Sequence, residues 1–222
     1  MEVAIDSSAE QAVKHHRPLV HIGVLALQGD YAKHLEILSK IESVQARLVR
    51  VPDEIDQCDG LIIPGGESTT LAKLMKRYGV DEAITRRSRE GMPVFGTCAG
   101  LILLARDIED SDQPRLGLMD ITVRRNAFGR QVDSFETPIH IEGLCSEAVK
   151  GIFIRAPFVT AVGGDAEVMA ALDTGEIVMV RQGNCLAAAF HPELTSDTRV
   201  HAYFADMVSA SAKDAERKTA RV

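Results

Sequence analysis

The most constraining stretch of the sequence is Gly91 to Ala105, GMPVFGTCAGLILLA, in which two apolar runs flank a glycine-rich turn. The first run, Pro93–Phe95, suits a buried strand, and the second suits the start of a buried helix. Cys98 lies between them. Small neighbours let other backbone approach the thiol, and N–H groups at a helix start stabilise a thiolate and a developing oxyanion. The stretch predicts a nucleophile at a strand–turn–helix elbow or, more simply, a buried core cysteine.

Strands and helices alternate through the first half of the chain. Apolar runs predict strands at 21–27, 47–51 and 59–64 before the elbow, and helical spacing predicts helices near 35–41, 71–78 and 81–90. Gly79 is expected to end the second of these helices. Alternation of this kind predicts an α/β fold with a mainly parallel sheet that helices cover on both faces.

The second half of the sequence has a different pattern. Short strand candidates separated by turn signals follow one another at 120–124, 137–142, 151–155, 168–172, 177–181 and 185–190. Because they come in series without helices, we expect antiparallel pieces on the edge of the sheet. A last helix is predicted from Thr198 to about Ala210. We therefore expect a mobile tail at 1–20, a single domain at 21–210 and a frayed tail at 211–222.

Composition excludes several classes of function. Of the 222 residues, 45% are hydrophobic, which supports a full core, and the net charge of −7 argues against a nucleic-acid or anionic membrane surface. No apolar run approaches the roughly 20 residues of a membrane span, and the first 20 residues lack the apolar segment of a signal peptide. The four cysteines are widely spaced, which favours reduced thiols in the cytoplasm over a disulfide framework or a zinc site.

His191-Pro192-Glu193 follows an apolar strand end. A carboxylate two residues from an imidazole can orient it and stabilise its charged form, and a nucleophilic thiol needs such an oriented base. Alone, this tripeptide is more often structural. Together with Cys98 it supplies the two missing members of a catalytic triad.

Gly65-Gly66 ends the third predicted strand, and Ser68 or Thr69 is expected to cap the helix that follows. Because parallel strand ends gather at one edge of an α/β sheet, this turn is expected to lie beside Cys98. Glycine there would let a backbone N–H reach the oxygen that the N–H after Cys98 also contacts. The alternative is an ordinary strand–helix turn.

Taken together, these motifs resemble the class I, triad-type glutamine amidotransferases. Within that class the chain is similar to the glutaminase subunits of pyridoxal 5′-phosphate synthase over about 22–208. The residues that carry this narrower resemblance are Leu27-Gln28-Gly29 with His34, Pro64 to Thr70, Arg125 to Phe135, Phe153 to Pro157 and Phe190 to Leu194. The resemblance implies a flavodoxin-like three-layer sandwich with added antiparallel strands.

The resemblance also implies roles for individual residues. Cys98 would be the nucleophile, His191 the base and Glu193 its orienter. The amides of Gly66 and Ala99 would form the oxyanion hole. The residues implied to bind L-glutamine are Gly66, Glu67, Ser68, Arg125, Ile154 and Arg155. A guanidinium fork matches an α-carboxylate well, although without the resemblance Arg124-Arg125 would be interpreted as a solvated pair.

The implied reaction is hydrolysis of the glutamine side-chain amide, with no cofactor and no metal. Ammonia would pass to a synthase subunit in a complex of twelve synthase and twelve glutaminase subunits. Two alternatives stay open at this point: the glutaminase of another amidotransferase, such as imidazole glycerol phosphate synthase, and a non-enzymatic thiol sensor of the same fold.

Overall fold

The computed structural model describes residues 19–125, 134–144 and 146–219. The strands are β1 (Val20–Leu25), β2 (Val44–Val49), β3 (Gly60–Ile63), β4 (Val94–Thr97), β5 (Ala105–Ile108), β6 (Met119–Arg124), β7 (Ser134–Ile139), β8 (Val149–Ile154), β9 (Phe158–Val162), β10 (Glu167–Ala171), β11 (Ile177–Gln182) and β12 (Cys185–Ala188). The helices are α1 (Tyr31–Leu38), α2 (Pro52–Asp56), α3 (Ser68–Tyr78), α4 (Val80–Arg89), α5 (Ala99–Leu104), the short 3₁₀ helix η1 (Pro192–Leu194) and α6 (Arg199–Thr219).

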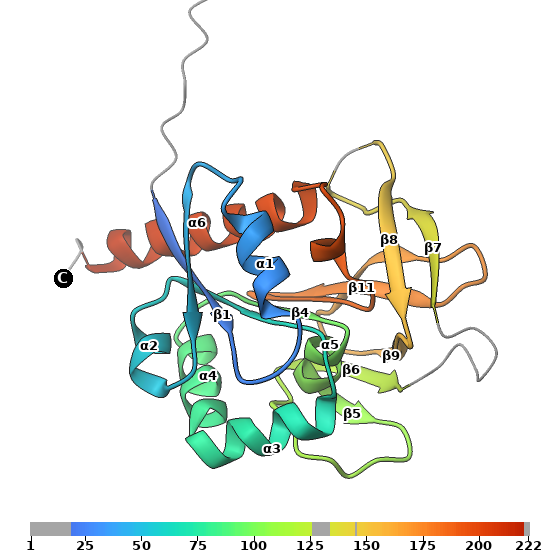
Figure 1. Cartoon of the computed structure of the whole chain (residues 1–222), viewed down its shortest axis with the longest axis horizontal. Helices are drawn as coiled ribbons and strands as arrows, with labels where there is room; N and C mark the ends of the chain where they lie inside the picture. The colour runs from blue at the N-terminus through green and yellow to red at the C-terminus, as the bar shows by residue number, and fades with distance from the viewer. Residues whose placement is uncertain (1–18, 126–133, 145, 220–222) are drawn as a thin grey trace, which may run out of the picture.

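In the described part of the chain, one large sheet forms the centre of the molecule, with strand order β2-β1-β3-β4-β12-β11-β9-β6-β5 and β10 paired to β11. The strands from β2 to β12 in this order run parallel, whereas β12, β11, β9 and β6 pair antiparallel in turn. Figure 1 shows α1 and α6 on one side of the sheet and α3, α4 and α5 on the other. This arrangement confirms the predicted α/β class, with a large parallel portion and added antiparallel strands.

The parallel centre is apolar on both faces because helices cover both. Every residue of β3, β4 and β12 is buried. The elbow helix α5 packs so tightly on β3 that a Cβ atom at Gly100 would lie 2.2 Å from the backbone oxygen of Ile63. Only glycine permits this approach, and it fixes the helix that starts directly after Cys98.

A small second sheet, made of antiparallel β7 and β8, lies beside the end of β12. Aromatic contacts hold it: the rings of Phe135 and Phe153 stack with centroids 4.5 Å apart, and the tilted ring of Phe190, which follows β12, has its centroid 5.9 Å from that of Phe153. The backbone N–H of His191 also donates to the Ile152 carbonyl of β8 at 2.8 Å. The small sheet therefore positions the segment that carries His191.

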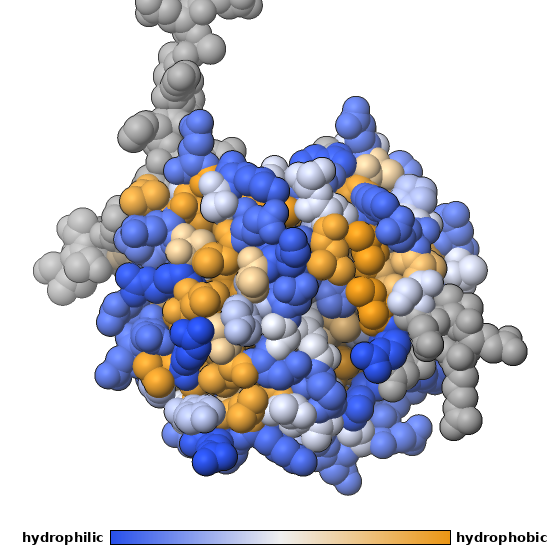
Figure 2. All heavy atoms as spheres, viewed as in Figure 1, coloured by the Kyte–Doolittle hydropathy of each residue, from blue (hydrophilic) through white to orange (hydrophobic). Residues whose placement is uncertain are grey.

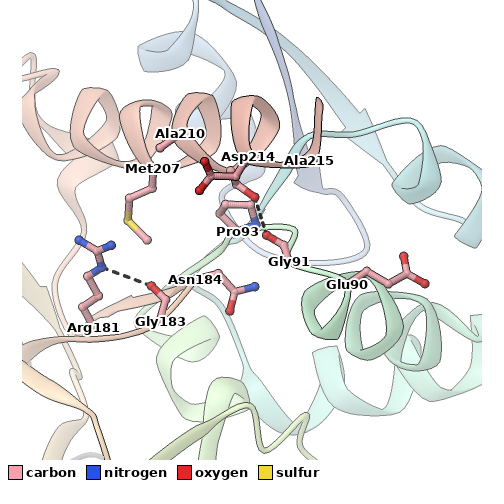
Figure 3. Close-up of a pocket in the computed structure, with 11 residues that line it drawn as sticks. Glu90, Gly91, Pro93, Arg181, Gly183, Asn184, Met207, Ala210, Asp214 and Ala215 are labelled. Carbon is pink, nitrogen blue, oxygen red and sulfur yellow. Dashed lines mark hydrogen bonds between the residues drawn. The ribbon is translucent and has the colours of Figure 1, made fainter. Parts of the chain in front are cut away.

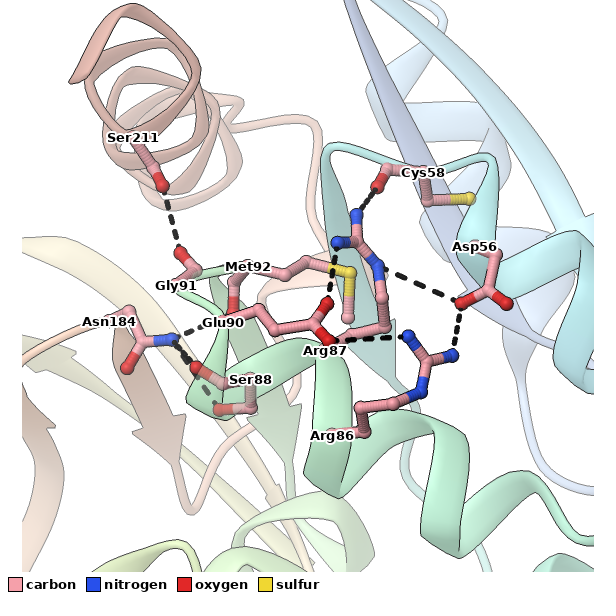
Figure 4. A network of polar contacts seen from close by, with 10 residues as sticks. All are labelled: Asp56, Cys58, Arg86, Arg87, Ser88, Glu90, Gly91, Met92, Asn184 and Ser211. Carbon is pink, nitrogen blue, oxygen red and sulfur yellow. Dashed lines mark hydrogen bonds and ion pairs between the residues drawn. The ribbon is translucent and has the colours of Figure 1, made fainter. Parts of the chain in front are cut away.

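Two arginines tie helix α4 to the end of α2 and to the segment that follows it, as Figure 4 shows. Arg87 Nη2 donates to the Cys58 carbonyl at 2.9 Å, and Arg86 Nη2 lies 2.5 Å from Asp56 Oδ1. At the other end of the network, Ser211 of α6 donates to the Gly91 carbonyl at 2.8 Å. These contacts join three helices below the start of β4.

Several elements differ from the sequence-based expectations. The strand at Cys185–Ala188 is not an edge piece, because it pairs parallel with β4 in the middle of the sheet. Strands β5 and β9 and helix α2 were not predicted, and β1 begins at Val20 inside the expected tail. Helix α6 continues to Thr219, so residues 211–219 are helical where a frayed tail was expected.

The visible surface mixes both kinds of residue. Figure 2 shows hydrophobic residues interspersed among hydrophilic ones on the face seen in Figure 1. The large hydrophobic side chains exposed in the described residues are Leu19, Val51, Tyr78, Ile154 and Val168. None of the helices in the described ranges is long and apolar enough to cross a membrane.

Candidate active site

Cys98 lies at the turn between β4 and α5, as the sequence predicts. Its backbone has φ 49° and ψ −100°, a conformation that costs energy in a non-glycine residue and persists only where the surroundings impose it. The Cys98 N–H donates to the Ala188 carbonyl of β12 at 2.8 Å. The side chain is largely covered but belongs to the lining of a cavity. The geometry is therefore that of a nucleophile elbow rather than of a core cysteine.

His191 and Glu193 lie together at the end of the neighbouring strand. The Nδ1 atom of His191 is 2.7 Å from Oε1 of Glu193, and both residues are buried. Because a carboxylate only accepts hydrogen bonds, Nδ1 carries the proton, which leaves Nε2 as the atom for proton exchange with a substrate or a thiol. The spacing across Pro192 thus produces the predicted pair of imidazole and orienting carboxylate.

The electrostatics of this pair favour its charged form. Burial alone would lower the pKa of His191, but hydrogen bonds to Cys98 and Glu193 and the charges of those groups raise the pKa to about 10. Burial also disfavours the ionised form of Glu193, yet the neighbouring imidazoles of His34 and His191 hold the pKa of this carboxyl below its usual value. His191 is therefore a cation at neutral pH, balanced by the Glu193 carboxylate.

The Gly65-Gly66 turn lies directly over these groups. A Cβ atom at Gly65 would lie 2.4 Å from Cε1 of His191 and 3.3 Å from Cβ of Cys98, so no other residue fits there without displacing the site. Gly66 has φ +154°, and a Cβ atom on it would lie 2.6 Å from the Gln28 side-chain oxygen. The turn is held by the Glu67 N–H, which donates to that oxygen at 3.0 Å.

One cavity of about 320 Å³ opens beside the thiol. Its lining combines Cys98 with all six residues expected to bind glutamine and with two others, from the loop after β1 and from α5. The lining residues are Gln28, Gly66, Glu67, Ser68, Cys98, Ile102, Arg125, Ile154 and Arg155. Ala99 is the first residue of α5 and is buried behind the thiol. Residues from 28 to 155 thus reach one cavity although they belong to distant parts of the chain.

Glu67, one of the residues expected to bind glutamine, also has a structural role. The Glu67 carboxylate, rather than Ser68 or Thr69, caps α3, accepting from the N–H groups of Thr69 and Thr70. Hydrogen bonds from Thr70 and Thr69 lower the pKa of Glu67 to about 2, so it is ionised at neutral pH. Both oxygens of its carboxylate therefore accept hydrogen bonds from the start of α3, although the residue also lines the cavity.

Arg125 is oriented by a residue that the sequence analysis did not identify. Its Nη1 atom donates to Oε1 of Gln113 at 2.8 Å, and Ser68 Oγ donates to the same oxygen at 3.2 Å. Arg125 is thus not one of a solvated pair; Arg124 instead pairs with Glu109. Gln113 lies in an irregular segment with no periodicity, so no local pattern could have shown its role. Gln28, by contrast, follows a predicted strand, where ligand contacts gather.

Some predicted features lie outside the described residues. These are the tail at 1–18, the central part of the Arg125–Phe135 run at 126–133, and Cys145. Among the described residues, no group of His, Cys, Asp and Glu has the arrangement of a metal site.

A second cavity, of about 350 Å³, lies at the opposite ends of the strands, between α6, the start of β4 and the β11–β12 turn (Figure 3). Arg181 lines it but is engaged, since its Nη1 donates to Tyr203 Oη at 2.7 Å and its Nε donates to the Gly183 carbonyl. None of the lining residues is a nucleophile paired with a base. The chemistry is therefore concentrated at the Cys98 cavity.

The fold is that of the glutamine amidotransferases. A crystal structure of a glutamine amidotransferase superposes with a TM-score of 0.80 and 47% sequence identity, covering 84% of this chain and 98% of that one. The fold alone is shared with a chain in the structure of PurLQS from Thermotoga maritima, at a TM-score of 0.59 and 17% identity over 89% of this chain and 98% of that one. The chain belongs to the SNO glutamine amidotransferase family, whose model matches residues 24–210.

Curated relatives within this family share one name. Pyridoxal 5′-phosphate synthase subunit PdxT from Desulforudis audaxviator is 55% identical over 190 residues, which cover 86% of this chain and the whole of that protein. The protein of the same name from Streptomyces coelicolor is 57% identical over 192 residues, which cover 86% of this chain and 94% of that protein. The narrower resemblance found in the sequence motifs is thereby confirmed.

Proposed function

We propose that this chain hydrolyses L-glutamine to glutamate and ammonia as the glutaminase subunit of a pyridoxal 5′-phosphate synthase. The observation that carries the proposal is the strained, nearly buried Cys98 thiol, which hydrogen-bonds to His191 of the charged His–Glu pair and lines one cavity with two arginines. The identity of 55% to a whole PdxT protein supports the choice of this glutaminase over that of another amidotransferase.

The proposed reaction starts from a Cys98 thiolate paired with the His191 imidazolium. The sulfur attacks the side-chain carbonyl carbon, and the amides of Gly66 and Ala99 stabilise the oxyanion. His191 then protonates the departing nitrogen, the C–N bond breaks, and ammonia leaves a glutamyl thioester. Water, deprotonated by His191, then attacks the thioester; the C–S bond breaks, glutamate leaves, and the Cys98 thiolate is again paired with the His191 imidazolium. Glu193 keeps His191 oriented throughout.

Substrate selection follows from the rest of the cavity. Arg125 and Arg155 supply guanidinium groups for the α-carboxylate of glutamine. Ser68 and the Gly66–Glu67 backbone bring polar groups from the other wall, and Ile154 contributes an apolar contact. Neither a metal nor a cofactor has a step in this scheme.

We propose further that the ammonia passes to a synthase subunit, in a cytoplasmic complex of twelve subunits of each kind, without membrane or nucleic-acid partners. A single domain at 21–210 would carry the glutaminase. Because free hydrolysis wastes glutamine, we expect the synthase subunit to increase glutaminase activity.

The test is glutamate release from L-glutamine by the wild type and by Cys98→Ala, each with and without a pyridoxal 5′-phosphate synthase subunit. We expect wild-type activity to be highest with the synthase, and Cys98→Ala to lose it while the complex still uses free ammonia. Cys58→Ala is the matched control, since Cys58 is buried beneath α2 with its thiol on the Glu54 carbonyl, and should retain activity.

Near-wild-type hydrolysis by Cys98→Ala would refute the mechanism. Stimulation by the synthase of imidazole glycerol phosphate, but not by that of pyridoxal phosphate, would favour the other glutaminase. If the wild type hydrolyses no glutamine with either partner, the thiol-sensor alternative gains support.

A further inference from the structure

Two buried histidines lie behind Glu193, outside the cavity. His34 comes from α1 and His201 from α6, and neither has any exposed surface. Nδ1 of His34 is 3.0 Å from Nε2 of His201. Nε2 of His34 is 3.1 Å from Oγ1 of Thr97, the residue before Cys98, and 3.5 Å from Oε2 of Glu193. The proposed reaction uses none of these contacts.

The neighbours of His34 decide which ring nitrogen carries its proton. Oε2 of Glu193 is buried and has no hydrogen bond of its own. A carboxylate only accepts, so an N–H on Nε2 of His34 is attracted to it, whereas a lone pair there would be repelled. With the proton on Nε2, Nδ1 of His34 accepts from the Nε2–H of His201. The Nε2–H of His201 then points to His34, and the Nε2–H of His34 points to Glu193.

Both histidines are neutral in this arrangement. Burial lowers the pKa of His34, and burial lowers the pKa of His201 to about 3. The charged groups that act on His34 are Glu193, His191 and, at the start of its own helix, Asp30. The other elements packed around it contribute the neutral groups His201 from α6 and Thr97 from β4. His34 therefore presents a dipole to Glu193 without adding a charge.

We propose that His34 is a positioning residue for glutamine hydrolysis, with His201 fixing its tautomer. Its Nε2–H faces the second oxygen of Glu193 and contacts Thr97, so it holds the carboxylate whose first oxygen orients His191. Through Thr97 it also supports the strand end that carries Cys98. This role rests on the proposed function, because His34 acts through Glu193 and His191.

The first test compares three substitutions of His34. His34→Leu removes the donor, His34→Asn keeps a polar group only near the former Nδ1, and His34→Gln places an N–H near the former Nε2. We expect kcat for glutamine, measured with the synthase, to fall at least about tenfold in the Leu and Asn variants with little change in KM, because a poorly oriented base weakens the transition state. His34→Gln should recover most of the loss. His21→Leu, which removes a partly exposed histidine that pairs with Asp59, should match the wild type.

The second test does not depend on glutaminase activity. Alkylation of Cys98 by iodoacetamide is followed against pH by mass spectrometry of the Cys98 peptide. We expect His34→Leu and His34→Asn to shift the alkylation profile to higher pH, and His34→Gln to restore it, because Glu193 no longer holds His191 against the thiol in the first two variants.

The proposal is overturned if the folded Asn variant keeps the wild-type kcat and alkylation profile, or if Gln is no better than Asn in either measurement. If His34→Leu does not fold, the comparison of His34→Gln with His34→Asn in kcat and in the alkylation profile still tests the proposal. If the wild type hydrolyses no glutamine, the proposed function fails, while the alkylation profiles still test whether His34 positions the pair.

Discussion

At the scale of single residues, Gln113 joins the two walls of the candidate substrate cavity. Its Oε1 atom accepts from Arg125 at 2.8 Å, from Thr69 at 3.1 Å and from Ser68 at 3.2 Å. An arginine only donates, so the atom that faces it must be the amide oxygen. Gln113 is buried, and its side chain therefore fixes where the Arg125 guanidinium points.

Replacement of Gln113 by leucine should weaken glutamine binding more than it slows the chemical step. Without the acceptor, Arg125 is free to adopt other rotamers, and the loss of one hydrogen bond to a charged group predicts a rise in KM of about tenfold. Gln182→Leu is the matched control, since Gln182 accepts from the Asp120 N–H on a distant part of the sheet. Steady-state kinetics with the synthase present measure both; an unchanged KM in Gln113→Leu would contradict this role.

The residues of the site differ in how far the sequence could predict them. Cys98, His191 and Glu193 lie in short motifs whose local spacing already suggests chemistry, and the structure brings them together. His34 and His201 meet across 167 positions, and Gln113 reaches Arg125 from a loop. No local pattern encodes such contacts, because they exist only once the sheet has brought distant segments together.

At the scale of elements, α4 depends on two arginines in different surroundings. Arg87 has a quarter of its side chain exposed and donates to the Cys58 carbonyl, whereas Arg86 is about half exposed and pairs with an equally exposed Asp56. Ion pairs in water contribute little, but a backbone carbonyl that loses its partner in a covered position is costly.

We therefore expect Arg87→Met to lower the free energy of unfolding by about 1–3 kcal/mol, and Arg86→Met to lower it by less than about 1 kcal/mol. Urea unfolding of the two variants measures the difference. Both should keep wild-type glutamine hydrolysis, since α4 lines no part of the Cys98 cavity. Equal losses in the two variants would show that the Cys58 carbonyl does not need Arg87.

The elements that sequence predicted well have signals of their own. Strand β3 is a continuous apolar run, β4 begins with one, and Gly79, with φ 68°, ends α3 as expected. Strand β5, ARDI, has an exposed arginine and an aspartate, and pairing with β6 rather than propensity makes it a strand. The central place of β12 depends on its partner β4, which lies about ninety residues earlier and which periodicity cannot identify.

At the scale of the whole molecule, buried ionisable groups connect the active-site edge to the packing of the helices. Glu193, His34 and His201 join η1, α1 and α6 beneath the end of β4, and all three are almost completely inaccessible to water. Their protonation states are therefore coupled to folding, because the unfolded chain exposes each of them to water.

The sign of that coupling is opposite for the different histidines. His201 titrates near pH 6.5 when unfolded but at about 3 when folded, so between these values the unfolded chain binds a proton that the folded chain does not. The lowered pKa of His34 acts in the same direction. His191, with its pKa raised to about 10, contributes stability that is complete below about pH 6.5 and is lost as the pH rises through 10.

Stability should therefore fall as the pH drops below about 6.5, by at most about 1.4 kcal/mol per pH unit for each of His34 and His201. His201→Leu removes one of these groups and should flatten the decline, whatever its effect on stability at neutral pH. Urea unfolding at several pH values from 7 to 5 measures the slopes. An equally steep decline in His201→Leu would mean that His201 takes up its proton in the folded protein, and the neutral pair beneath Glu193 would have to be abandoned.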